Sequence, residues 1–159
     1  HVKKSNFDKL GWSLIELDLL FNEFLKHFAN VVFTMDIEKN ISQSIIRNKF
    51  NVLDFSNNKF TKKNNNIFLY DNITGKDLYN TITNSAKTVA FHGMMTNLAA
   101  IEKKPVIDLW YSKMTNWDDY RNTRNAFYEF KPKYKGYDFI IPRKNIIKTI
   151  KKLKYILKK

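Results

Sequence analysis

Short apolar runs recur along the chain at wide intervals, and this spacing limits the folds that the chain can adopt. The runs cover residues 31–35, 67–70, 88–91, 105–110 and 138–141. Their length and their content of β-branched and aromatic residues are typical of strands. Apolar residues occupy consecutive positions in them instead of alternating with polar ones. We therefore expect strands covered on both faces, as in a parallel sheet.

Helical periodicity fills the segments between these runs. Apolar residues spaced by three and four positions predict helices over residues 6–28, 41–50, 74–86, 94–103, 117–130 and 145–157. Gly11 weakens the first turns, so the first helix can begin as late as Trp12. Residues 57–66 are rich in Asn and Lys and show no periodicity, which predicts a surface loop.

Strict alternation of helices and strands implies crossover connections between parallel strands. A chain of 159 residues fits one domain of ordinary size. We therefore predict a single α/β domain over residues 1–159, with a three-layer, Rossmann-like architecture. Its sheet has about five strands, is mainly parallel, and carries helices on both faces.

Composition excludes several classes of protein. Cysteine is absent, which removes disulfide scaffolds, thiolate metal sites and cysteine nucleophiles. No apolar run approaches the roughly 20 residues of a membrane-spanning helix, and the first apolar stretch carries acidic residues that a signal peptide lacks. The chain has no phosphate-binding P-loop and no Gly-x-Gly-x-x-Gly motif, and its three His residues are too scattered to predict a metal site.

The formal net charge of +13 leaves three classes of anionic partner open: nucleic acid, a membrane surface, and small substrates. Residues 143–159 carry repeated Lys and Arg and no acid, so the predicted C-terminal helix could lie on an anionic leaflet. The other interpretation is a Lys- and Asn-rich background in which the helix packs by its apolar side. We favour that interpretation for this helix.

The loop after the third predicted strand, at residues 92–96, is the most informative. Ligands of open α/β sheets bind beyond the carboxyl ends of the strands. Here His92 and Gly93 end a strand, and a helix begins almost at once. Its free amides suit a phosphate or carboxylate, and His92 and the Thr96 hydroxyl could add hydrogen bonds. The alternative is a tight turn with Met94 and Met95 as core filler.

Residues 77–110 resemble part of the nucleotide-sugar half of GT-B glycosyltransferases, with the cadence of heptosyltransferase-like enzymes. The resemblance rests on His92-Gly93-Met94-Met95-Thr96-Asn97-Leu98-Ala99-Ala100 followed by Lys104-Pro105-Val106-Ile107-Asp108-Leu109-Trp110. The family has Asp-Ser-Gly-Pro-Met-His before its Leu-Ala-Ala. When that motif is aligned without gaps on Leu98-Ala99-Ala100, the family's acidic residue, serine, glycine and histidine fall on His92, Gly93, Met94 and Asn97. The paired glutamates of many such enzymes are missing, since only Glu102 lies nearby.

The resemblance implies a glycosyltransferase-like domain that binds a nucleotide-sugar donor without a cofactor or metal. A glycan or lipid-linked acceptor, and a place in cell-envelope, lipopolysaccharide or capsule synthesis, follow from the same resemblance. So does a cytoplasmic location, with peripheral contact at the inner face of the membrane. A GT-B enzyme has a second half for the acceptor, so residues 1–159 would form one domain, alone or as a fragment of a two-domain enzyme. No general base is assigned.

The expected substrate-binding residues come from three places in the sequence. They are His92, Gly93, Met94, Met95, Thr96, Asn97, Asp36, Arg121 and Arg124. Arg121 and Arg124 lie one helical turn apart and could clamp a diphosphate; the alternative is that they pair with neighbouring acids on the surface.

Two other functions stay open. One is a non-catalytic basic module for nucleic acid or an anionic membrane surface, of which nucleic acid is the less favoured. The other is a degenerate Rossmann-like domain that serves only as a scaffold.

Overall fold

A computed structural model describes residues 1–35, 41–110 and 132–158 of the chain. The helices are α1 (Lys4–Leu10), α2 (Leu14–Phe24), α3 (Ile41–Lys49), α4 (Gly75–Asn84), α5 (Met94–Ile101) and α7 (Ile146–Leu157). The strands are β1 (Val31–Phe33), β2 (Asn51–Asp54), β3 (Lys59–Thr61), β4 (Ile67–Asp71), β5 (Thr88–Phe91), β6 (Val106–Leu109) and β7 (Tyr137–Ile140). The helix predicted over residues 117–130 lies outside the described residues.

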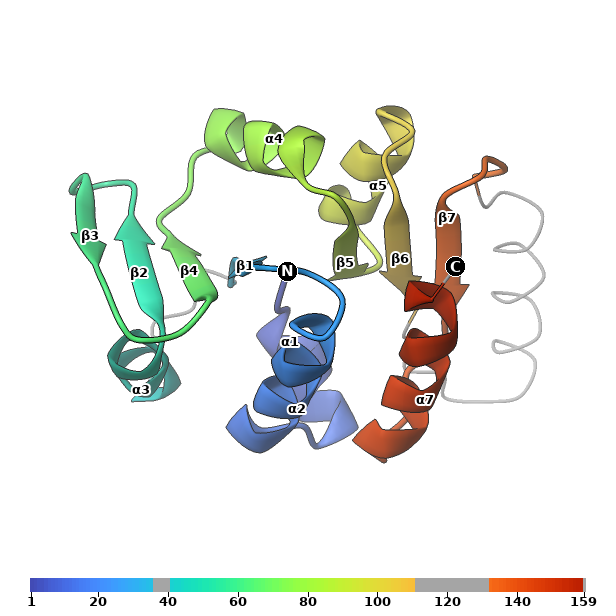
Figure 1. The fold of residues 1–159 in the computed structure, drawn as a ribbon, viewed down its shortest axis with the longest axis horizontal. Coiled ribbons are helices and arrows are strands. Elements are labelled where there is room, and N and C mark those ends of the chain that lie inside the picture. The colour runs from blue at the N-terminus through green and yellow to red at the C-terminus, as the bar shows by residue number, and fades with distance from the viewer. Residues whose placement is uncertain (36–40, 111–131, 159) are drawn as a thin grey trace.

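The strands form two ladders that stand side by side (Figure 1). One ladder has the order β1-β4-β2-β3 and the other the order β5-β6-β7. All pairs are parallel except β2 with β3. Helices α4 and α5 cover one face, and α1, α2, α3 and α7 lie on the other. The predicted three-layer, mainly parallel α/β fold is therefore confirmed.

The N-terminal residues connect the two ladders. The backbone amide of Val2 donates to the carbonyl of Thr34 at 2.8 Å, just beyond β1. The amino group of His1 donates to the carbonyl of Val89 on β5 at 2.9 Å. Val2 also forms a parallel bridge with Met35. His1 and Val2 therefore lie between β1 and β5 as a very short piece of extended chain.

The hairpin of β2 and β3 was not predicted. We expected a helix through Phe50 followed by a polar loop, whereas residues 51–54 and 59–61 pair as antiparallel strands. All three residues of β3 are exposed, so the strand lacks the apolar pattern by which strands are recognised. Asn51 secures the base of the hairpin: its buried side-chain amide donates to the carbonyls of Asn65 and Ile67.

The long first helix that we predicted is two helices. Gly11 adopts φ 68°, a left-handed conformation that glycine reaches without a steric penalty, and it ends α1. Ser13 then caps α2: its hydroxyl accepts from the amide of Ile15, and its own amide donates to Glu16 at 2.7 Å. The residues before Gly11 are helical as well, from Lys4, and the second helix begins at Leu14, two residues after the expected start near Trp12.

A continuous apolar core joins both ladders to the helices beneath them. Phe21 of α2 contacts Phe33 of β1 at a ring-centroid distance of 4.7 Å. Phe7 of α1 and Trp12, which follows α1, pack against Phe91 of β5. The amphipathic stripe predicted for α7 is buried in this core, where Leu153 is fully inaccessible. None of the described helices is long and apolar enough to cross a membrane.

Candidate functional site

The order of the strands reverses between β1 and β5. From β1 the ladder runs outward through β4, and from β5 it runs the other way through β6 and β7 (Figure 1). Open α/β sheets bind ligands beyond the carboxyl ends of the strands at such a reversal. His92 and Gly93 follow β5 directly, so the fold places the predicted loop at this position.

The side chain of His92 is anchored by a buried carboxylate. Its Nδ1 lies 2.7 Å from Oδ2 of Asp108, a residue of β6 that is 1% exposed. The ring also packs against Trp110 at a centroid distance of 4.2 Å. We assign the proton to Nδ1, since a carboxylate accepts and does not donate. Asp108 and Trp110 together fix the orientation of the imidazole ring, and the side chain is 39% exposed.

Tyr137 completes a chain of three polar side chains. Its hydroxyl donates to the same Oδ2 of Asp108 at 2.6 Å. Burial raises the pKa of Tyr137 far above its usual value, and the hydrogen bond to Asp108 and its negative charge raise it further. Tyr137 therefore stays protonated and remains a donor. Oδ1 of Asp108 is buried and has no hydrogen-bond partner among the described residues.

Gly93 makes the turn into α5. Its φ of 156° with ψ of −153° belongs to a region that is essentially open only to glycine. The hydroxyl of Thr96 accepts from the Gly93 amide at 3.1 Å and donates to the Gly93 carbonyl at 3.0 Å. The Thr96 hydroxyl, which we expected to face a ligand, is therefore used inside the turn, and the side chain is buried.

The remaining loop residues divide between core and surface. Met95 is buried against α4 and β5, as the core-filler interpretation expected, whereas Met94 is 64% exposed. Asn97 is exposed one turn into α5, and its amide donates to the carbonyl of Gly93. Helix geometry leaves the first amides of α5, those of Met94 and Met95, without a partner inside the helix. Apart from His92, the side chains of this loop therefore contribute less to the site than its backbone.

Three expected site residues, Asp36, Arg121 and Arg124, lie outside the described residues.

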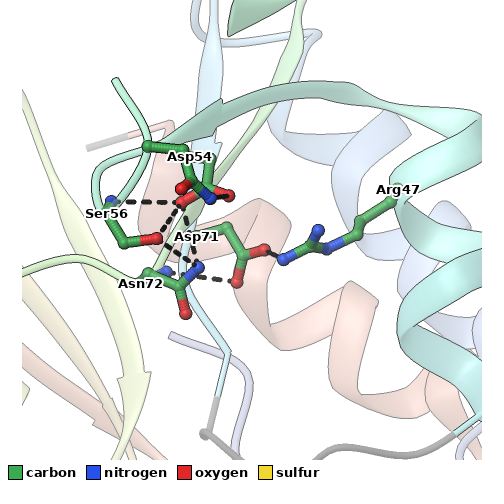
Figure 2. Close-up of polar contacts among 6 residues, drawn as sticks. Arg47, Asp54, Ser56, Asp71 and Asn72 are labelled. Atoms are coloured by element: carbon green, nitrogen blue, oxygen red, sulfur yellow. Dashed lines mark hydrogen bonds and ion pairs between the residues drawn. The ribbon is translucent and has the colours of Figure 1, made fainter. Parts of the chain in front are cut away.

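A second polar cluster lies at the carboxyl ends of β2 and β4 (Figure 2). Asp54 accepts from Ser56, Asn57 and Asn72, and Arg47 pairs with Asp71. These hydrogen bonds, with Asn72 the strongest, hold the pKa of Asp54 far below its usual value. Both oxygens of Asp54 are used by the loop that they organise. The cluster is therefore a structural device that fixes the turn after β2.

Sequence reasoning missed Asp108 and the role of Tyr137. Asp108 interrupts an otherwise apolar strand, and a lone acid in such a strand is a signal for a buried, paired carboxylate. The contact with His92 depends on the register of β5 with β6, in which Ala90 lies opposite Asp108. Tyr137 stands in a stretch rich in lysine, and no local pattern marks it as a partner of Asp108.

Comparisons with known proteins give no relative for the chain. No family model matches it, and neither the curated proteins nor the solved structures contain a match.

Proposed function

We propose that the carboxyl edge of β5 and β6 binds the diphosphate of a nucleotide-sugar donor and supports transfer of the sugar. The observation that carries this proposal is the pairing of His92 with buried Asp108 beside the start of α5. Backbone amides at a helix N-terminus and a carboxylate-backed imidazole both suit an anion. The resemblance of residues 77–110 to the nucleotide-sugar half of GT-B glycosyltransferases supports the choice of a nucleotide-sugar as that anion.

His92 would act on the leaving group. In sugar transfer an acceptor oxygen attacks the anomeric carbon, the bond from that carbon to the diphosphate breaks, and negative charge grows on the diphosphate. The His92 imidazole, held in place by Asp108 through Nδ1, would lie beside a phosphate oxygen of the departing diphosphate, where the first amides of α5 also stabilise the growing charge. No metal is needed for this step. The residue that takes the acceptor proton is not assigned.

Asp108 would position His92 and would not touch the substrate. Its burial fixes the carboxylate, and Tyr137 holds it from the other side. An Asp108→Asn variant keeps the shape but presents a donor as well as an acceptor to the ring. We expect it to disturb the orientation and proton placement of His92 more than the binding of the donor.

Calorimetric titration with UDP-glucose, GDP-mannose and ADP-glucose tests the proposal. We expect at least one of them to bind, and Met94→Asp to weaken that binding by about tenfold or more, because it sets a negative charge beside the first amides of α5. Met94→Asn is the matched neutral control and should bind like the parent chain. Met94 is 64% exposed, so neither change disturbs the core. Equal affinity in the two variants, or no binding of any of the three donors, would contradict the proposal.

A second candidate function is attachment of α7 to an anionic lipid surface. Its outward face carries Lys148, Lys151 and Lys152 beside two exposed apolar side chains, Ile147 and Tyr155. Such a face suits acidic headgroups. Sedimentation with vesicles of phosphatidylserine and phosphatidylcholine should show binding that falls as salt rises, and vesicles of phosphatidylcholine alone should show none.

A further inference from the structure

A large apolar cavity lies in the middle of the structure, between β1 and β5. We call it the central slot. Its volume is about 680 Å³, and strands of both ladders line it, including Val31, Val32 and Val89. The cavity is partly open to solvent, so an extended segment of chain can enter it. What its position between two parallel strands can hold depends on the backbone groups and side chains at its walls.

The backbone on both sides of the central slot is set up to pair. In a parallel ladder the amide and carbonyl of one residue point to the same neighbour. Val31 uses its amide on the β4 side, bonding to Asn66, so the amide and carbonyl of Val32 point away from β4. Thr88 likewise bonds to Pro105 on the β6 side, and Val89 points away from β6.

His1 and Val2 show how a strand would fit there. Val2 pairs with the β1 side through Thr34, and His1 pairs with the β5 side through Val89. This is the alternation of a strand held between two parallel neighbours. If this pattern continued before His1, the backbone amide of the residue directly before His1 would lie at the carbonyl of Val32. The backbone carbonyl of the residue before that one would lie at the amide of Val89.

The two walls of the central slot differ in chemistry. Toward α2 the lining is apolar, with Leu17, Leu20 and Phe24, whereas toward α4 it is polar, with Asn80 and Asn84. Val2 lies in the apolar core on the α2 side, whereas His1 contacts Thr34. Successive side chains of a strand point to opposite faces. The residue directly before His1 would thus face α2, and the one before that would face α4.

We propose that the central slot is the seat of an extended β-strand joined to the amino nitrogen of His1, with apolar side chains toward α2 and small polar ones toward α4. This strand would merge both ladders into one continuous sheet and lie next to β5. The backbone groups of Val32 and Val89 and the different chemistry of the two walls are the grounds for choosing a strand as the occupant. It does not depend on the proposed sugar-donor site.

Two extended chains of identical composition test this proposal. One adds Ser-Val-Ser-Val directly before His1, so that both Val side chains face α2. The control adds Val-Ser-Val-Ser, which turns both toward α4, because a shift of one residue exchanges the faces. We expect the first extension to raise Tm by about 4 °C or more above the control. It should also slow hydrogen exchange of the Val32 and Val89 amides at least about tenfold.

Two results would overturn the proposal. One is the same Tm and the same amide protection in both extended chains. The other is full protection of the original chain by the free peptide acetyl-Ser-Val-Ser-Val-amide at 1 μM, which would show that linkage to His1 is not what seats the strand.

Discussion

The hydrogen bond from Tyr137 to Asp108 provides the sharpest test of the site's architecture. Its donor–acceptor distance is 2.6 Å, and its acceptor is a carboxylate that is 1% exposed. Hydrogen bonds to charged groups contribute about 1.5–3 kcal/mol to stability, and neutral ones about 0.5–1.5 kcal/mol. Tyr137→Phe removes this bond with little change in packing. We therefore expect it to lower the free energy of unfolding by about 1.5–3 kcal/mol, or Tm by roughly 3–12 °C.

Tyr134 offers a matched control on the same segment. Its hydroxyl donates at 2.7 Å to the backbone carbonyl of Lys104, which is a neutral acceptor. Tyr134→Phe should therefore cost only about 0.5–1.5 kcal/mol. Urea unfolding at pH 7, followed by tryptophan fluorescence and circular dichroism, measures both variants. A larger loss for Tyr134→Phe than for Tyr137→Phe would contradict the assignment.

A double-mutant cycle separates the pair from its surroundings. Asp108→Ala alone also removes the anchor of His92 and leaves a small cavity, so its total loss of stability is hard to interpret. The coupling between Asp108→Ala and Tyr137→Phe cancels those shared effects. We expect a coupling energy of about 1.5–3 kcal/mol, and a value below about 0.5 kcal/mol would refute a direct charged hydrogen bond.

Three further predictions concern the scaffold. Ser13→Ala removes the side-chain cap of α2 and should lower the free energy of unfolding in urea by about 0.5–2 kcal/mol. An unchanged free energy of unfolding would contradict a stabilising role for this cap. Leu153→Ala should cost about 2–5 kcal/mol because Leu153 is fully buried, whereas Ile147→Ala on the same helix, 49% exposed, should cost much less. Asp54 has a folded-state pKa below its unfolded value, so its stabilising contribution is present above about pH 4 and is lost as the pH falls further. Asp54→Asn should therefore flatten the acid limb of the Tm–pH curve, and an unchanged limb would contradict this role.

Local sequence patterns predicted the parts of the fold that depend on local periodicity. The strand over residues 67–70 and the stripe of α7 were found because their apolar residues are close in sequence and share one environment. Strand β3 could not be found this way, since its three side chains are exposed and its pairing uses only backbone groups. Gly11 was predicted to weaken the first turns of one long helix. The division into two separate helices, α1 and α2, was not predicted.

The candidate site shows the same division between local and long-range information. His92 and Gly93 were found because a strand, a glycine and a helix follow one another in sequence. Asp108 comes 16 residues later, and its contact with His92 exists only through the pairing of β5 with β6. Tyr137 depends in turn on β6 pairing with β7. Strand register is set by tertiary packing, so a local reading of the sequence finds the loop but not its supporting carboxylate.

The candidate site and the central slot are independent features of the fold, although both involve β5. His92, Asp108 and Tyr137 belong to the ladder β5-β6-β7, whose register does not require a strand on the other side of β5. The apolar layer of Phe7, Trp12 and Phe91 already holds β5 against α1 on one face. Filling the central slot would therefore make β5 more rigid without moving the contact between His92 and Asp108. If the extended chains fail to gain stability, the proposal for donor binding at His92 is unaffected. If no donor binds, the proposal of a strand in the central slot is unaffected in turn.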